Sequence, residues 1–321
     1  MASVPADEYE ADLVVAARDA VADDVIRLTL SDPSGAELPA WDPGAHIDLV
    51  LGPDLTRQYS LCGSPGDRSA FTVGVLREPS GRGGSQMIHD TLQAGSAVRV
   101  RGPRNHFALV PSADYVFIAG GIGITPILPM ITQAEQQGAT WTLLYGGRSP
   151  ASMAFTDALA AYGDRVTLMP GTDIAPMAAA LDERLGTPRP GTLVYACGPE
   201  GLLAAVEGRC ATWPAGSLHL ERFTAKAIDD AVDTEFTAVL ARSGITITVP
   251  VGRSIFEAAQ DNGVTVLGSC HEGICGTCET VIIEGEADHR DSVLNADEQA
   301  ANETMMICVS RCRSAIITLD L

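Results

Sequence analysis

The 321-residue sequence is poor in positive charge and in aromatic side chains. Lys226 is its only lysine, and 21 basic residues stand against 41 acidic ones, which leaves a formal net charge of −20. Such a field opposes polyphosphates and anionic lipid surfaces, so we exclude a general nucleic-acid or membrane-surface role. Residues 226–321 hold 16 acidic and 6 basic side chains, a net charge of −10. Half of the excess charge therefore lies in this final segment, which indicates a separate module with its own partner surface.

Features of secreted and membrane proteins are also missing. Residues 1–10 contain three acidic residues and no basic or apolar leader segment, so we expect no secretory signal. Residues 115–134 carry no charge and have the length of a bilayer span. Three glycines and two prolines interrupt them, so we expect a strand, a glycine turn and a helix rather than a membrane span. Eight cysteines are too few for a disulfide scaffold in a chain of this length, and they cluster towards its end. We therefore expect a cytoplasmic, metal-binding protein.

Hydrophobic patterning divides the first 225 residues into two parts. Short β-rich runs separated by turn residues fill residues 1–110, which is typical of a small antiparallel barrel or sandwich. Strands and helices alternate over residues 111–225, which predicts βαβ units and a parallel sheet. The predicted strands are 12–17, 25–30, 46–51, 58–61, 71–76 and 97–100 in the first part, and 115–119, 141–145, 165–169, 193–197 and 217–223 in the second. The predicted helices are 126–137, 153–162, 174–185 and 202–209.

A third part follows a predicted linker. Residues 224–233 are small, polar and acidic, and we place the linker there. Residues 235–321 are predicted to form a hairpin, a helix over 254–262 that Ser254 caps, a cysteine-rich loop and closing strands. The order of elements indicates a small domain in which strands and a helix share one core.

The strongest motif is the cysteine-rich loop Cys270-x4-Cys275-x2-Cys278, followed after 29 residues by Cys308. Three thiolates on a tight loop and a fourth from a strand can surround a two-iron cluster, and this is the plant-type [2Fe–2S] spacing. A structural zinc site is the alternative, although zinc loops more often pair two C-x2-C units or add histidines. Cys312 is a second candidate for the fourth ligand. We favour Cys308, because the apolar run before it would fix it at a strand end.

A flavin site is predicted in the first part of the chain. The strand that contains residues 57–60 can bring Arg57 to a phosphate, Tyr59 to the ribityl chain or ring, and the Ser60 hydroxyl to flavin N5. A glycine- and serine-rich loop, residues 80–85, runs into a predicted helix, whose first amides make an anion site for a terminal phosphate. The contacts expected here are Arg57, Tyr59, Ser60, Val75, Leu76, Gly83, Gly84 and Ser85.

A nicotinamide nucleotide site is predicted in the second part. Gly121 and Gly123 lie between a buried strand and a helix, where their backbone can approach a pyrophosphate. The run Cys197-Gly198-Pro199 ends another strand of the same sheet, at the edge where such ligands bind, so Cys197 can flank the nicotinamide C4. Arg148 stands where an acidic residue would bind the ribose of NADH, and it can instead meet a 2′-phosphate or stack on adenine. Both NADH and NADPH therefore stay open.

Along the chain the flavin site comes first, the nicotinamide site second and the cysteine-rich loop last. This arrangement resembles that of the phthalate dioxygenase reductase family, which includes the reductases of vanillate demethylase-type oxygenases. The resemblance covers nearly the whole chain and rests on residues 57–60, 81–85, 120–126 and 197–199 and on Cys270, Cys275, Cys278 and Cys308. It implies FMN rather than FAD, and it slightly favours NADH. It also implies that Thr125 and Phe223 touch the flavin. The implied multidomain fold is an antiparallel β-barrel flavin domain (1–110), an α/β parallel-sheet NAD(P)H domain (111–225) and an α+β, β-grasp plant-type ferredoxin domain (235–321).

The motifs and the resemblance together predict an NAD(P)H-dependent flavin iron–sulfur oxidoreductase. Electrons would pass from the nicotinamide to FMN beside Ser60 and Cys197, the residues expected at the reacting atoms, then to the cluster and to a Rieske-type demethylating or ring-hydroxylating oxygenase. The acidic ferredoxin module predicts a basic docking patch on that partner. Two alternatives stay open. The chain can serve a separate haem-thiolate monooxygenase, or it can act as a redox sensor without fast electron flow.

Overall fold

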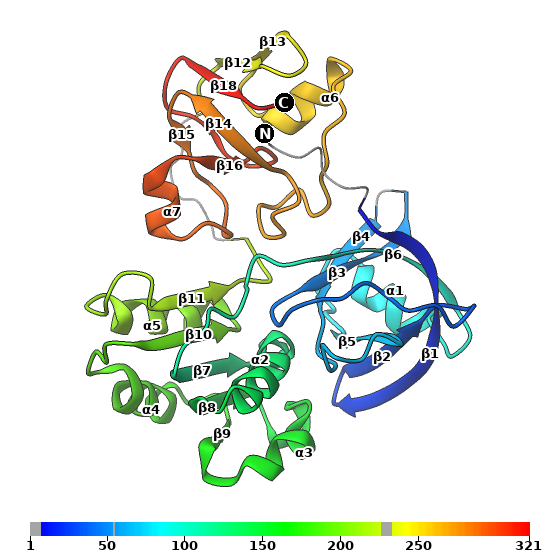
Figure 1. Cartoon of the computed structure of the whole chain (residues 1–321), viewed down its shortest axis with the longest axis vertical. Helices are drawn as coiled ribbons and strands as arrows, with labels where there is room; N and C mark the ends of the chain where they lie inside the picture. The colour runs from blue at the N-terminus through cyan, green and yellow to red at the C-terminus, as the bar shows by residue number, and fades with distance from the viewer. Residues whose placement is uncertain (1–7, 54, 226–232) are drawn as a thin grey trace. The chain divides into compact units, whose positions relative to one another are not determined.

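The computed structural model describes residues 8–53, 55–225 and 233–321, and the chain forms two compact units, 1–221 and 222–321 (Figure 1). The first unit contains both parts that the sequence separates into a barrel and a parallel-sheet domain. The domain boundaries expected near residues 110 and 235 stay predictions. Most of the expected linker, residues 224–233, lies outside the described residues. Within the described ranges no helix is long and apolar enough to cross a membrane.

A six-stranded antiparallel sheet with the order β4-β3-β6-β1-β2-β5 begins the first unit. Leu61, directly after β4, bridges to Val73 of β5, so the two edges meet and the sheet closes into a barrel. Alternate side chains face inwards: Ile26, Leu28 and Leu30 are buried, whereas Arg27 is exposed and Thr29 is only half-buried. All six predicted strands are present, as β1 (Glu10–Ala22), β2 (Val25–Ser31), β3 (His46–Gly52), β4 (Leu55–Ser60), β5 (Ala70–Leu76) and β6 (Ala97–Arg104); α1 (Gly84–Thr91) follows β5.

A parallel sheet with the order β11-β10-β7-β8-β9 completes the first unit. Its central strand is buried and uncharged from Tyr115 to Gly120, because helices cover both faces. Phe117 packs in the core that includes Ile127 of α2, and Val116 in the core that includes Leu181 of α4 and Leu203 of α5. The elements are β7 (Asp114–Gly120), η1 (Gly121–Gly123), α2 (Ile124–Gln136), β8 (Thr140–Gly147), β9 (Val166–Pro170), α4 (Ile174–Leu185), β10 (Thr192–Cys197), α5 (Glu200–Cys210) and β11 (Leu218–Glu221).

The helix predicted over residues 153–162 is wrong in length. The segment forms only a single helical turn, α3 (Thr156–Leu159), between the 3-10 turns η2 (Pro150–Ser152) and η3 (Ala160–Arg165). Phe155 adopts a left-handed conformation with φ of 62° directly before α3, and Gly163 has φ of 56° and ψ of −132°. A continuous helix cannot contain either conformation. The apolar residues of the segment therefore pack into the core beside the parallel sheet, but they do so without forming one long helix.

The second unit is built on a mixed five-stranded sheet with the order β13-β12-β18-β14-β16. Helix α6 covers one face, where Phe256 and Ala259 share a core with Ile317. Ser254 caps α6 as predicted, in a capping box with Glu257. The elements are β12 (Phe236–Leu240), β13 (Ile245–Val249), α6 (Ile255–Asp261), β14 (Glu279–Glu284), β15 (Ala287–Asp288), α7 (Ala296–Ala301), β16 (Thr304–Met306), β17 (Arg311–Cys312) and β18 (Ile316–Leu319).

Candidate functional site

The carboxyl edge of the parallel sheet brings together the two motifs predicted to bind the nucleotide. Strands β7 and β10 are neighbours, and the turns that follow them are in direct contact. A Cβ on Gly123 would lie 2.3 Å from the Cys197 carbonyl oxygen, and one on Gly120 would lie 2.6 Å from Pro199 Cδ. Gly121 opens the turn with φ of 54°. Only glycines allow this close approach, and the N-terminus of α2 directly behind them suits a pyrophosphate.

Ser60, Cys197 and Glu221 form a polar cluster where the barrel meets this sheet edge. They are the last residues of β4, β10 and β11, and Cys197 pairs with Glu221 in the sheet register. The Cys197 thiol lies 3.9 Å from the Glu221 Oε2, and the Ser60 hydroxyl lies beside the same carboxyl group and lowers its pKa. The structure thus joins the two residues predicted at the reacting atoms. It adds Glu221, which no motif in the sequence singles out.

Desolvation governs the protonation of this cluster. Glu221 is half-buried as a whole residue, but its carboxyl group is enclosed, and this burial raises its pKa to about 8, against the lowering effect of the neighbouring Ser60 and Cys197 side chains. Burial, together with the neighbouring Glu221 carboxylate, also holds the pKa of the Cys197 thiol well above its usual value. Near pH 7 both groups keep their protons. The cluster is therefore neutral and can donate a proton to an atom placed beside it.

The residues predicted to bind a phosphate in the barrel lie close together. Helix α1 begins directly after Gly83, which has φ of 81°. The Arg57 side chain lies against this helix start, because a Cβ on Gly84 would be 2.6 Å from Arg57 Cγ. Arg57 also donates to the Arg82 carbonyl at 3.0 Å, and the Ser85 hydroxyl accepts from a loop amide. A guanidinium and the first amides of a helix thus share one place, which fits a phosphate.

The other expected flavin contacts differ in how exposed they are and in what they pack against. Tyr59 and Leu76 are half-buried, and burial raises the pKa of the Tyr59 hydroxyl. The Val75 side chain packs in the barrel core, and its expected contact with the flavin stays a prediction. Thr125 of α2 packs against β5, where a Cβ on the glycine of that strand would lie 2.8 Å from its Cγ2. Phe223 is 38% exposed and belongs to the second unit, so its expected contact with the flavin stays a prediction.

The adenosine end of the nucleotide site is marked by Arg148. It follows β8 directly and is exposed. The ion pairs of the described residues do not include it. Its guanidinium is therefore available to a ligand, and both NADH and NADPH stay open.

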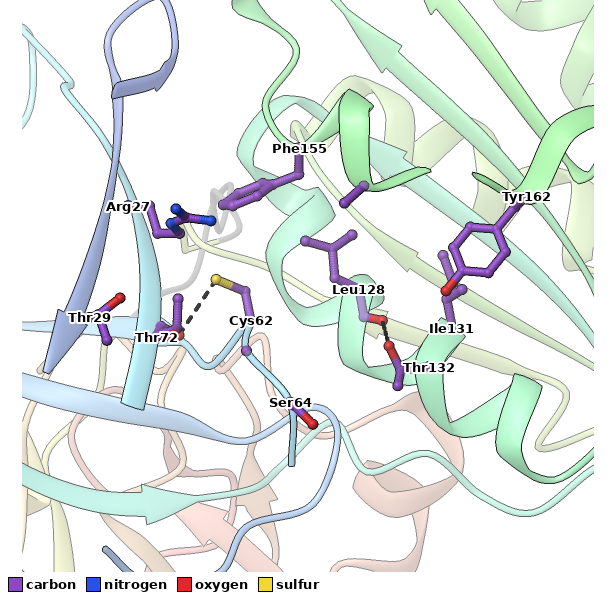
Figure 2. Close-up of a pocket in the computed structure, with 12 residues that line it drawn as sticks. Arg27, Thr29, Cys62, Ser64, Thr72, Leu128, Ile131, Thr132, Phe155 and Tyr162 are labelled. Carbon is purple, nitrogen blue, oxygen red and sulfur yellow. Dashed lines mark hydrogen bonds between the residues drawn. The ribbon is translucent and has the colours of Figure 1, made fainter. Parts of the chain in front are cut away.

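A separate pocket of about 360 Å³ lies between the barrel and α2 (Figure 2). Arg27 of β2 and Thr72 of β5 line one side, and Leu128 of α2 and Phe155 line the other. Cys62 also lines it, and burial raises the pKa of that thiol to about 12. None of the predicted site residues lines this pocket. The predicted flavin and nucleotide contacts therefore form a different site.

Four cysteines of the second unit meet in one place. The thiols of Cys275 and Cys308 each lie beside that of Cys270, and the Cys308 thiol also lies beside that of Cys278. All four residues are buried, whereas the Cys312 thiol bonds to a carbonyl and a hydroxyl of the following turn. No three His, Cys, Asp or Glu side chains in the described part of the protein surround a single-ion position. Four thiolates are the donor set of a plant-type cluster.

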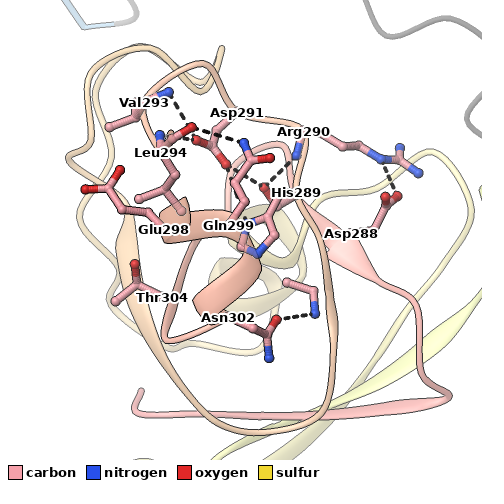
Figure 3. A network of polar contacts seen from close by, with 12 residues as sticks. Asp288, His289, Arg290, Asp291, Val293, Leu294, Glu298, Gln299, Asn302 and Thr304 are labelled. Carbon is pink, nitrogen blue, oxygen red and sulfur yellow. Dashed lines mark hydrogen bonds and ion pairs between the residues drawn. The ribbon is translucent and has the colours of Figure 1, made fainter. Parts of the chain in front are cut away.

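A polar network holds the segment around Asp291 (Figure 3), and the backbone of the cysteine loop contacts this segment. The Ser292 amide donates to the Gly273 carbonyl at 2.8 Å, and a Cβ on Gly273 would lie 3.1 Å from the Asp291 Cα. The Asp291 carboxylate accepts from the amides of Val293 and Leu294. These contacts fix the segment on which the loop rests. The loop that carries three cysteines is therefore held in place by the fold as well as by any bound metal.

Gly123→Ala should disrupt the nucleotide edge. The added Cβ would meet backbone atoms of Cys197 and Gly198, which cannot swing away. Overpacking of this kind costs about 1–3 kcal/mol, so we expect a lower Tm and a higher KM for the nucleotide. Gly201→Ala is the matched control, because its Cβ meets open space in α5 and alanine favours a helix by about 1 kcal/mol. Equal Tm values for the two variants would contradict the close contact.

Known proteins share both the sequence and the structure. Residues 239–313 match the family model described as a 2Fe-2S iron-sulfur cluster binding domain. The chain is 45% identical over 307 residues to phenoxybenzoate dioxygenase subunit beta of Ectopseudomonas oleovorans, with 94% of each chain covered. It is similar to the solved structure of phthalate dioxygenase reductase, described as "a modular structure for electron transfer from pyridine nucleotides to [2Fe-2S]" (TM-score 0.71, 36% identity, 98% of each chain).

A fusion protein is also similar. The solved structure of an intact type IV self-sufficient cytochrome P450 monooxygenase matches with a TM-score of 0.89 and 43% identity over 97% of this chain. The match covers 41% of the fusion protein, so this chain spans about two fifths of its length. The likeness therefore concerns one segment of a longer protein.

Proposed function

Since the chain belongs to the phthalate dioxygenase reductase family, we propose that it passes electrons from NAD(P)H through FMN and a [2Fe–2S] cluster to a Rieske-type oxygenase. It is an NAD(P)H-dependent flavin and iron–sulfur oxidoreductase, the reductase component of an oxygenase system. One observation carries the proposal. In its second unit the chain brings four cysteines together. In its first unit Ser60, on the strand that also carries Arg57, lies beside Cys197 and Glu221 at the edge of the parallel sheet where a nucleotide is expected.

Four side chains of the first unit, those of Arg57, Ser60, Cys197 and Glu221, have a stated role in this proposal. Bound FMN supplies the conversion of a two-electron donor into single electrons. Arg57 and the first amides of α1 hold its phosphate, and the Ser60 hydroxyl orients the ring at N5. Cys197 lies at the nicotinamide position, where its buried, protonated thiol adds no charge. Glu221 keeps a proton on its carboxyl group beside both of them.

The proposed partner is an oxygenase component with a basic docking patch. Residues 226–321 carry a net charge of −10, which would attract such a patch and speed the encounter. We place the protein in the cytoplasm, because all eight cysteines are free in the structure and thiolate ligands persist in a reducing compartment. Service to a separate haem-thiolate monooxygenase is consistent with the likeness to the fusion protein, but that likeness does not favour it.

The decisive experiment offers two acceptors to the FMN- and cluster-loaded protein, the oxygenase component of a phthalate dioxygenase system and a haem-thiolate monooxygenase domain. We expect NADH or NADPH to reduce the Rieske-type acceptor faster, with a rate that falls as salt screens the docking charges. Faster reduction of the haem acceptor would favour the alternative partner. Reduction of neither, with the flavin still turning over, would favour a redox sensor.

Glu221→Gln should remove a pH dependence of folding stability. The carboxyl group titrates near 4.5 when unfolded and near 8 when folded, so the folded protein binds more protons between these values. The stabilisation is complete below pH 4.5 and is lost as the pH rises through 8. The loss is at most about 5 kcal/mol, at about 1.4 kcal/mol per pKa unit. Glutamine does not ionise, so the variant should resist urea better than the parent at pH 9.

The matched control is Glu183→Gln, since the side chain of Glu183 is 80% exposed on α4. We expect the parent and this control to lose stability in parallel between pH 6 and pH 9, and Glu221→Gln to lose less. Identical slopes for all three proteins, measured by urea unfolding, would show that the Glu221 carboxyl group titrates normally in the fold.

A further inference from the structure

One face of the sheet in the second unit is apolar and uncovered. On β14, Val281 and Ile283 are 49% and 55% exposed, and Ile316 on the neighbouring β18 is 56% exposed. The intervening residues face the other way, where Ile282 and Ile317 pack into the core that α6 covers. We call Val281, Ile283 and Ile316 the apolar sheet face.

Uncharged side chains continue across the same side of the sheet. Thr318 follows Ile316 on β18 with one inward residue between them, and it pairs in register with Val239 of β12. Val239 in turn pairs with Thr246 of β13, which is exposed. On β14 the outward positions between Glu279 and Glu284 are valine and isoleucine, and the outward positions of the described strands β18, β12 and β13 are threonine, valine and isoleucine. In a protein with a net charge of −20, so large an uncharged face indicates a contact surface.

Carboxylates stand at the ends of β14. Glu279 directly follows Cys278, one of the four clustered cysteines, and Glu284 ends the strand; both are exposed. The position of Glu279 is fixed, because its carboxylate accepts a 2.6 Å hydrogen bond from the Thr304 hydroxyl, and Thr304 lies opposite Val281 in the sheet. The apolar sheet face therefore begins beside the cysteine cluster and has acidic groups at both ends of its central strand.

This charge pattern selects among the possible occupants. Two copies of the chain packed face to face would bring their acidic ends together, which opposes self-association. A protein with an apolar patch ringed by lysine or arginine would bury the isoleucines and pair a cation with Glu284. We propose that the apolar sheet face docks the electron acceptor, a protein with such a basic-rimmed apolar patch. The inference rests on the proposed function and adds to it the surface through which electrons leave.

The test uses the full-length protein, loaded with FMN and cluster, and cytochrome c as the probe, a basic protein whose exposed haem edge is ringed by lysines. Ile283→Lys places a cation in the apolar sheet face and should lower the second-order rate of cytochrome c reduction about tenfold or more. Ile283→Thr, which keeps a β-branched residue in the strand, should lower it less. Reduction of ferricyanide, which needs no docked protein, should stay within about twofold of the parent.

Val251→Lys is the matched control. It adds the same charge to the same unit at a side chain that is 61% exposed, but it lies in the turn after β13, outside the apolar sheet face. Equal rates for Val251→Lys and Ile283→Lys would overturn the proposal, because net charge alone would then explain the effect. A parent dimer that Ile283→Lys dissociates would overturn it in favour of a second copy.

Two further outcomes separate this inference from the proposed function. Slower reduction of the cluster by NADH in Ile283→Lys would show that the first unit occupies the face, and would contradict an external acceptor. If the proposed function is wrong, the parent protein already shows it, because NADH would leave its cluster oxidised. Failure of the docking inference appears only in the variants, with the parent fully active.

Discussion

Cys278→Ser should lower NAD(P)H-dependent reduction of cytochrome c by about 100-fold or more, since disturbing even a partner outside a metal's ligand set costs about 10- to 100-fold. Ferricyanide reduction should survive, because the flavin can pass electrons to a small oxidant directly. The Cys278 thiol contacts that of Cys308 within the four-cysteine group, and a serine hydroxyl is a poor substitute for a thiolate on iron. Steady-state rates with both acceptors, together with iron analysis, measure the effect.

Cys312→Ser is the control for this experiment. Cys312 is as buried as the four clustered cysteines and lies four residues after Cys308, but its thiol contacts the turn that follows it. We expect the variant to keep its iron and both activities. Equal losses in the two variants would make Cys312 a ligand, and survival of both activities in Cys278→Ser would take the cluster off the electron path.

Arg57→Ala should weaken FMN binding about 10- to 100-fold, because a hydrogen bond to a charged group contributes about 1.5–3 kcal/mol. The Arg57 side chain lies against the start of α1, so its removal leaves only the helix amides for the phosphate. Flavin content after gel filtration and a fluorescence titration of the apoprotein with FMN give the change in affinity.

Arg77→Ala provides the comparison within the same barrel. Arg77 forms a surface ion pair with Asp90, and such pairs contribute about 0–1 kcal/mol. FMN affinity should therefore be unchanged in Arg77→Ala. If Arg57→Ala also binds FMN as the parent does, the phosphate does not lie at the start of α1.

Much of the fold follows from local sequence patterns. The strands of the barrel and of the parallel sheet occur where apolar runs alternate with turn residues, because burial of one or both strand faces dictates those runs. The helix at 153–162 fails because Phe155 takes a left-handed conformation and residues from Ala160 onwards form a 3-10 turn, and the apolar spacing reveals neither. Helix α7 has no buried residue, so it leaves no periodic signal, and only its cap at Asn295 marks it.

Some residues of the candidate site can likewise be predicted from local sequence patterns, whereas others cannot. The cysteine cluster is predictable because three of its four members lie on one short loop with a recognisable spacing. Glu221 is one of 41 acidic residues and becomes special only through the register that sets it beside Cys197. The apolar sheet face is hidden for a related reason. Thr280–Ile283 has the composition of a buried strand, and only the assembled sheet shows that Val281 and Ile283 face outwards.

The most direct test is anaerobic rapid mixing of the protein, loaded with FMN, iron and sulfide, with NADH or NADPH, followed by visible absorbance. We expect the flavin band to bleach first and the cluster band to follow, fast enough to support acceptor reduction. A flavin that bleaches while the cluster stays oxidised would contradict the electron path. So would a protein that remains colourless after loading.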